Sequence, residues 1–170
     1  MPHFSYQWPE GVSEKLTRNF RAYEWFITGN DLHETLNPKV SESEAAYILR
    51  TAKAVQLARD HFGFPFWITS GHRAKELNTA IGGSKTSAHM YGRAIDFRPR
   101  DKWASKHTAR LSKEIAEWMW ENVEDLDQVI YYDLSRGGHV HFGIAAKGKK
   151  SRGELRHAAK GGGYPVIKRR

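Results

Sequence analysis

Two histidines at alternate positions, His139 and His141, form the first pattern in the sequence that suggests chemistry. Side chains two positions apart on a strand lie on the same face, so either imidazole could reach one metal ion. His89 adds a third imidazole, and the carboxylate of Asp96 follows it seven positions later, with Gly92 permitting a turn between them. Two nitrogens and one oxygen suit zinc, with a fourth position left for water. The same residues also fit a plainer interpretation, in which the histidines belong to an edge strand and Asp96 is a buried carboxylate bonded to backbone amides.

The surrounding sequence predicts the elements that must position these side chains. Apolar residues recurring every three to four positions indicate helices, and short runs of aromatic and β-branched residues indicate strands. Helices followed by several short strands are typical of an α+β fold, so we expect a single domain with a small, mainly antiparallel sheet flanked by helices and a zinc site on the sheet. The expected helices cover residues 13–27, 41–63 and 105–122. The expected strands cover residues 66–69, 93–97, 128–132 and 139–144. We expect a loop over residues 31–40 and a hairpin turn over residues 135–138.

Composition limits the class of protein further. The 170 residues suffice for one core, and the absence of cysteine excludes disulfides, thiolate nucleophiles and cysteine-based metal sites. Residues 147–170 carry nine basic side chains and one acidic one, an excess equal to the whole net charge of +8. We therefore expect a domain over 1–146, with 1–40 as a helix and loop extension, and a basic tail over 147–170. Nucleic acid is not an expected partner, because the body is neutral.

A series of short elements resembles the D-alanyl-D-alanine carboxypeptidase-like zinc peptidases. The most specific element is Ser-x-His-x-x-Gly-x-Ala-x-Asp, and the elements occur in the family's order over roughly residues 18 to 144. This family includes bacterial carboxypeptidases and many phage enzymes that degrade the cell wall. The elements are Ser70-Gly71-His72-Arg73, Glu76-Leu77-Asn78, Ile81 to His89, Gly92 to Phe97, Gln128 to Tyr131, and His139-Val140-His141.

The resemblance implies roles for individual residues. His89, Asp96 and His141 match the three ligands of one zinc ion per chain. Arg73 matches an arginine that contacts the substrate carbonyl and the developing oxyanion, although a salt bridge to Glu76 is an alternative role for it. His139 is expected beside the metal as a proton carrier or transition-state stabiliser, and His72 and Ser87 are expected on the substrate side.

Three departures from the family pattern limit this transfer. Ala88 stands where many relatives have glutamine, and His72 stands where tyrosine or phenylalanine is usual. Gly138 occupies the position at which one branch of the family has an acidic general base. The base is therefore not assigned by the resemblance, and our first choice is His139, followed by Asp133 on the preceding loop.

The implied function is hydrolysis of a bond in the stem peptide of bacterial peptidoglycan, either at D-Ala-D-Ala or between L-Ala and D-Glu.

The sequence does not start with a standard signal peptide, and it contains no apolar run long enough to cross a bilayer. We therefore expect a monomeric, phage-type lytic enzyme that accumulates in the cytoplasm and is released by a separate factor. The basic tail could attract anionic wall polymers. The alternative is a noncatalytic module that binds the wall or a polyanion, with a structural or lost metal site. The aromatic side chains of Phe4, Tyr6 and Trp8 could supply stacking surfaces for such a module, but we favour a role for them in covering the core.

Overall fold

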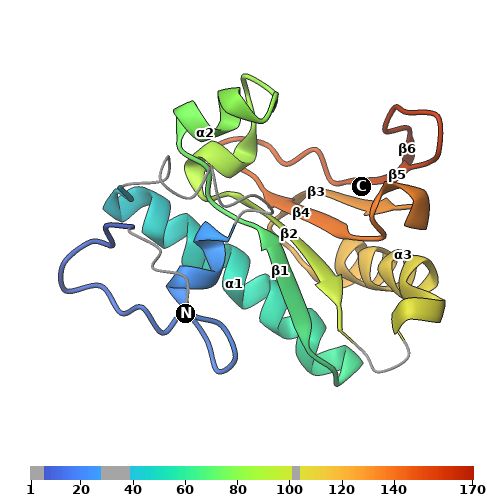
Figure 1. The fold of residues 1–170 in the computed structure, drawn as a ribbon, viewed down its shortest axis with the longest axis horizontal. Coiled ribbons are helices and arrows are strands. Elements are labelled where there is room, and N and C mark those ends of the chain that lie inside the picture. The colour runs from blue at the N-terminus through green and yellow to red at the C-terminus, as the bar shows by residue number, and fades with distance from the viewer. Residues whose placement is uncertain (1–5, 28–38, 101–103) are drawn as a thin grey trace. The chain divides into compact units, whose positions relative to one another are not determined.

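The computed structural model describes residues 6–27, 39–100 and 104–170, with the backbone alone described for residues 104–109. Figure 1 shows the elements in chain order. The chain divides into two compact units, one of Met1–Gln56 with Ile68–Ile95, and one of Leu57–Trp67 with Asp96–Arg170. Helix α1 (Glu42–Phe62) and strands β1 (Phe66–Ser70) and β2 (Ala94–Pro99) each run from one unit into the other. Phe4 and the expected loop over 31–38 lie outside the described residues.

The six strands belong to one sheet with the order β1-β2-β4-β3-β5-β6. Strand β3 (Leu126–Tyr132) pairs antiparallel with β4 (Val140–Ile144), with Ile130 opposite His141. The predicted hairpin is therefore confirmed. Its connection is a 3₁₀ turn (η4, Leu134–Arg136) followed by Gly137 and Gly138, both at positive φ, which glycine adopts without steric cost. The sheet with flanking helices confirms the predicted α+β fold.

The first unit begins differently from the prediction. The expected helix over 13–27 is wrong, because residues 15 and 21 form an isolated bridge and only a 3₁₀ helix follows (η1, Ala22–Phe26). The side chain of Gln56, from α1, accepts hydrogen bonds from the hydroxyl of Thr17 at 2.9 Å and the backbone N–H of Asn19 at 3.2 Å. These bonds hold the chain in a turn. The apolar side chains still form a core, and Phe20, Trp25 and Phe26 are buried.

Helix α1 begins as its sequence predicts. Ser41 and Glu44 form a reciprocal cap: a Glu44 carboxylate oxygen accepts from the Ser41 N–H at 2.8 Å, and the Ser41 hydroxyl accepts from the Glu44 N–H at 3.3 Å. Ile48, Ala52 and Val55 of this helix are fully buried. Two short elements were not predicted, helix α2 (Lys75–Ala80) and the 3₁₀ helix η3 (Ala88–Tyr91).

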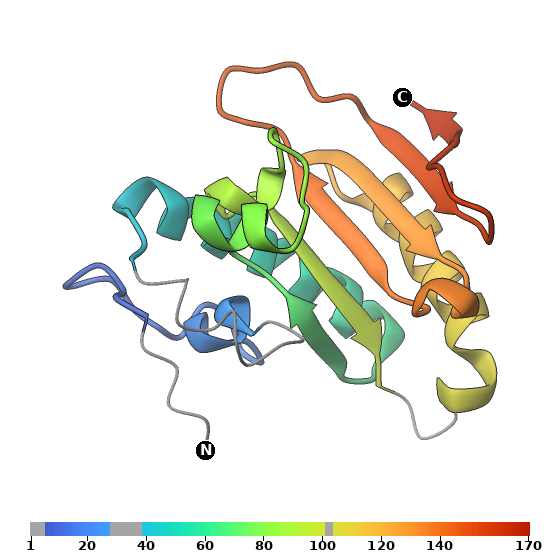
Figure 2. The same ribbon diagram turned by 45° about the horizontal axis from the view of Figure 1, so that its top comes forward.

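The second unit packs helix α3 (Ala104–Asn122) against β3, β4 and β5 (Figure 2). The contact faces are apolar: Ile115 and Met119 of the helix, Val129 of β3 and Phe142 of β4 are all fully buried. From residue 110 onward, α3 therefore turns an apolar side toward these strands. Among the described residues, no helix has the length and apolar character needed to span a membrane.

Part of the basic segment over 147–170 belongs to the sheet. Strand β5 (Glu154–Ala158) pairs in parallel with β3, and β6 (Val166–Arg169) pairs antiparallel with β5. Leu155 of this segment is fully buried, so β5 contributes to the core of the second unit. By contrast, Tyr164, Val166 and Ile167 are exposed.

The carboxylate of Glu154 is the main polar link within this segment. It is almost completely buried and accepts hydrogen bonds from the guanidinium groups of Arg156 (2.7 Å to Nη2) and Arg169. Burial by itself raises the pKa of Glu154, but these hydrogen bonds and the two positive charges outweigh burial and hold the pKa below its ordinary value. The basic segment therefore contains its own internal charge compensation.

Candidate metal centre

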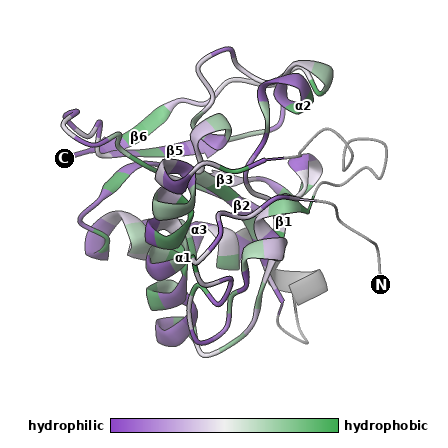
Figure 3. Ribbon diagram, turned by 90° about the vertical axis from the view of Figure 1, so that its left-hand side faces the viewer, coloured by the Kyte–Doolittle hydropathy of each residue, from purple (hydrophilic) through white to green (hydrophobic). Residues whose placement is uncertain are grey.

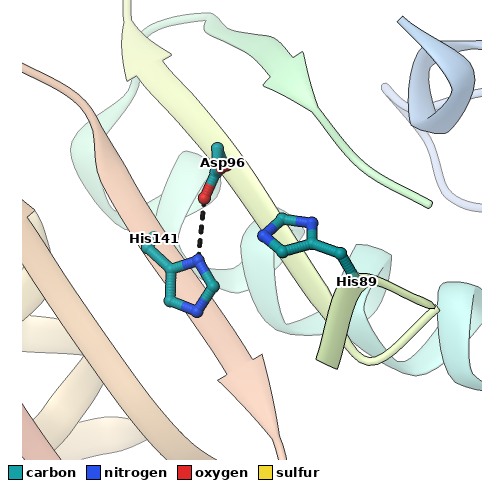
Figure 4. Close-up of side chains that lie close together, drawn as sticks. All are labelled: His89, Asp96 and His141. Carbon is teal, nitrogen blue, oxygen red and sulfur yellow. Dashed lines mark hydrogen bonds and ion pairs between the residues drawn. The ribbon is translucent and has the colours of Figure 1, made fainter. Parts of the chain in front are cut away.

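Three of the side chains singled out by the sequence lie together. His89 from η3, Asp96 from β2 and His141 from β4 each offer a ligand atom, and these atoms all lie within 4.8 Å of one another (Figure 4). His89 is 3% exposed, and the side chains of Asp96 and His141 are 13% and 15% exposed. The group is thus largely screened from solvent but still open to a small ligand.

The imidazole of His89 is oriented by the backbone. Its Nδ1 lies 2.7 Å from the carbonyl oxygen of Gly71, and because a carbonyl can only accept, Nδ1 carries the proton. The lone pair is then on Nε2, and Figure 4 shows that this end of the ring faces Asp96 and His141. A backbone carbonyl that fixes the tautomer in this way is a common partner of a metal-binding histidine.

The segment that carries Gly71 is itself held against His89. The carbonyl oxygen of His89 accepts hydrogen bonds from the N–H of Arg73 at 3.1 Å and from Nδ1 of His72 at 3.2 Å. Gly71 packs directly on the backbone of Trp25, where an added Cβ would lie 2.4 Å from the Trp25 carbonyl oxygen. The absence of a side chain at residue 71 therefore lets this support approach closely.

We expect Gly71→Ala to weaken zinc binding by about 10- to 100-fold, the usual cost of disturbing the partner of a metal-ligating histidine. The new methyl group must displace rigid backbone, which moves the carbonyl away from His89. Zinc affinity measured by competition with a chelator, beside the circular dichroism spectrum, would check this. A folded variant with wild-type zinc affinity would show that the Gly71 carbonyl does not matter for the site.

The other two candidate ligands contact each other directly. Nδ1 of His141 lies 2.8 Å from Oδ1 of Asp96. In a tetrahedral zinc site, ligand atoms about 2 Å from the metal lie roughly 3.3 Å apart, so small side-chain adjustments suffice to bring all three donors to one ion. Two imidazole nitrogens and one carboxylate oxygen, with one tautomer fixed by a carbonyl, form a donor set that fits zinc.

His139 precedes His141 by two residues and is held by an aromatic stack. Its ring packs on Tyr132 with centroids 3.8 Å apart and planes 20° from parallel. Burial lowers the pKa of His139 to about 4, although the nearby charge of Asp96 acts in the opposite direction. The imidazole is therefore neutral at neutral pH.

Asp133, the second candidate base, has other partners. Its Oδ1 accepts from Nε2 of His157 at 2.7 Å, and its Oδ2 accepts from the N–H of Lys160 at 3.1 Å. The hydrogen bond from His157 is the largest cause that lowers the pKa of Asp133. These contacts link the end of β3 to β5 and to the residues that follow β5.

The remaining predicted residues lie in the first unit. Nε of Arg73 donates to the hydroxyl of Ser70 at 2.9 Å, which restricts the guanidinium group. His72 is 2% exposed with its ring against the edge of Phe26, and burial lowers its pKa. Ser87 is half-buried at the residue preceding η3, and its carbonyl accepts the N–H of Met90 at 3.2 Å.

Sequence reasoning did not find two supporting groups, the carbonyl of Gly71 and the ring of Tyr132. A backbone carbonyl leaves no signal beyond the Ser-Gly-His-Arg element itself. Tyr132 could have been found from the predicted hairpin, because its N–H donates to the carbonyl of His139 at 3.0 Å, which places the two residues opposite each other. Tyr6 and Trp8, two of the aromatic side chains suggested for a binding module, pack on the core: Tyr6 stacks on Phe26 at 4.4 Å, and Trp8 meets the same ring in an edge arrangement.

The sheet with its helices and the His89, Asp96 and His141 group together define the type of centre found in zinc peptidases. A family model described as peptidase M15 matches residues 19–119, which is more than half of the chain. The chain therefore belongs to the peptidase M15 family, the zinc-dependent, D-Ala-D-Ala carboxypeptidase-like peptidases that act on peptidoglycan. The matched range contains Arg73, His89 and Asp96, and the structure adds His141 from beyond it. No curated protein matches the chain in sequence.

Proposed function

We propose that this protein is a phage-type lytic enzyme that uses one zinc ion, held by His89, Asp96 and His141, to cut a peptide bond in the stem peptide of peptidoglycan. The observation that carries the proposal is the proximity of these three donors, with His89 already in the metal-binding tautomer. Two bonds are candidates, the D-Ala-D-Ala bond and the bond between L-Ala and D-Glu.

Zinc, when bound, supplies a Lewis acid that polarises a carbonyl and promotes ionisation of water. The protein supplies the remaining chemistry. Arg73, restricted by Ser70 and by its own N–H bond to His89, offers a fixed positive charge to an oxygen on which negative charge develops. His139, neutral and held by Tyr132, can accept a proton at its imidazole and return it to the leaving amine.

We infer that His139, rather than Asp133, carries this proton, because both oxygens of Asp133 already accept hydrogen bonds. His139→Ala is expected to lower kcat about 10²- to 10⁴-fold with zinc retained, whereas Asp133→Asn should change kcat by only a few fold. Steady-state kinetics on a soluble stem peptide, with zinc content measured in parallel, would separate the two residues. The opposite ranking would assign the proton transfer to Asp133.

Product mapping identifies the bond. Purified peptidoglycan would be incubated with the zinc-loaded protein, and the products would be analysed by mass spectrometry. A new D-Glu amino terminus with falling turbidity of the wall suspension means an endopeptidase and supports the lytic role. Release of D-Ala without loss of turbidity means a carboxypeptidase and removes that role. If walls of several compositions remain uncut, the peptidase proposal fails and a binding module becomes the better account.

A further inference from the structure

The first unit contains a cavity of about 750 Å³ that no step of the proposed reaction has used. It lies between the start of α1, helix α2, the Gly82-Gly83 loop and η3. Its volume falls within the range of sites for small organic groups, roughly 300–1,000 Å³, and is far larger than a lone ion needs. The cavity is therefore of a size to hold part of a substrate.

Positive charge dominates the lining of this cavity. Lys39, Lys75 and Lys85 contribute three ammonium groups, and Glu44 contributes the one carboxylate among the lining residues. Glu44 accepts two hydrogen bonds from Ser41, at 2.8 Å from its N–H and 2.7 Å from its hydroxyl, which hold its carboxylate at the start of α1. With three ammonium groups against one carboxylate, the net charge of the lining is positive and favours an anionic ligand.

The loop that carries Lys85 is held in place before any ligand binds. Nδ2 of Asn78 donates to the carbonyl of Ser84 at 2.9 Å, and the N–H of Gly83 donates to the carbonyl of Asn78 at 2.8 Å. Gly83 lies so close to the Asn78 side chain that an added Cβ would be 2.2 Å from Oδ1. A loop fixed in this way loses little conformational entropy when a ligand binds to it.

The cavity adjoins the segments that carry the proposed chemistry. His72, which lines it, immediately precedes Arg73, and Met90, which also lines it, immediately follows His89. Hydrophilic residues dominate the neighbouring helix α2 (Figure 3). A peptide whose scissile bond reached His89 would therefore pass close to the lysines.

We propose that this cavity is a subsite for a carboxylate of the substrate peptide, and that Lys75 and Lys85 make the protein select acidic stem peptides over amidated ones. The inference rests on the proposed function, because it takes the substrate to be a stem peptide. It adds a source of specificity that His89, Asp96 and His141 cannot provide, since their side chains are assigned to the metal ion.

The test uses two synthetic stem peptides that differ only in one side-branch group, a free carboxylate in the first and the primary amide in the second. For the wild-type protein without added metal, isothermal titration calorimetry should show that the carboxylate peptide binds about tenfold more tightly than the amide peptide. With zinc present, the carboxylate peptide should also have the lower KM. Lys75→Gln and Lys85→Gln should each reduce this preference and leave the amide peptide unaffected. Lys53→Gln, on an exposed part of α1 away from the cavity, is the matched control and should behave as wild type.

Each outcome decides a separate claim. Equal binding of the two peptides by the wild-type protein, or equal weakening of both by the lysine variants, would overturn the subsite. Carboxylate-dependent binding without cleavage of either peptide would support the subsite and contradict the peptidase proposal. Cleavage of both peptides at equal rates and affinities would support the peptidase and contradict the subsite.

Discussion

Replacing Asp96 by asparagine is expected to abolish zinc binding at micromolar protein and to lower peptide hydrolysis about a thousandfold or more. The amide keeps the size of the side chain but removes the negative charge of the Asp96 carboxylate, whose Oδ1 lies 2.8 Å from Nδ1 of His141, a second candidate ligand. Loss of a bound Lewis acid removes several kcal/mol of transition-state stabilisation, at about 1.4 kcal/mol for each tenfold in rate. Zinc content by elemental mass spectrometry and initial rates on a soluble stem peptide give the two readings. His89→Ala and His141→Ala should behave in the same way.

Asp125→Asn provides the matched control, because Asp125 is exposed in the turn before β3 and is not part of the metal group. It should keep wild-type zinc content and activity. An Asp96→Asn protein that retained stoichiometric zinc would show that the metal lies elsewhere. One that lost zinc but hydrolysed peptide normally would show that the metal is structural.

The second large effect concerns stability. Glu154→Ala is expected to lower the free energy of unfolding by about 3 kcal/mol, because it leaves the guanidinium groups of Arg156 and Arg169 without the buried carboxylate that they share. For a chain of this size, that loss corresponds to a fall in Tm of roughly 6–12 °C. Thermal unfolding followed by circular dichroism at neutral pH would measure it.

The pH dependence of this effect has a definite sign. Since the pKa of Glu154 is lowered in the folded protein, its stabilising contribution is complete above its ordinary value of 4.5 and is lost as the pH falls below that value. The difference in Tm between the wild-type protein and Glu154→Ala should therefore become smaller as the pH falls below 4.5. The exposed Glu124 supplies the control, because Glu124→Ala should leave Tm nearly unchanged. A Glu154→Ala protein as stable as wild type would mean that β5 and β6 do not depend on this ion-pair network.

Local pattern was enough to predict most of the sheet and to draw attention to His89, Asp96 and the alternating pair His139 and His141. The choice of His141 as the third ligand came from the resemblance to the family, because spacing alone left both histidines of the pair open. Strands β1, β2, β3 and β4 and helices α1 and α3 were predicted close to their observed ends, because each has a clear apolar period and, for α1, a cap at Ser41.

Long-range contacts account for what the sequence did not reveal. Residues 13–27 have helical spacing, but Gln56, almost forty positions later, bonds Thr17 and Asn19 and keeps the segment in a turn. Strand β5 lies within residues 147–170, and the high content of basic residues in that segment led us to predict a tail rather than a strand. Its parallel pairing with β3, and the compensation of its arginines by Glu154, depend on partners that local pattern does not show.

The most direct test of the proposed zinc peptidase is a titration of the metal-free protein with zinc while hydrolysis of a stem peptide is followed. Because one group of three ligands is proposed to hold one catalytic ion, the rate should rise in proportion to added zinc and stop rising at one equivalent per chain. Activity in the metal-free protein that zinc does not increase, or zinc bound at one equivalent without any hydrolysis, would contradict the account.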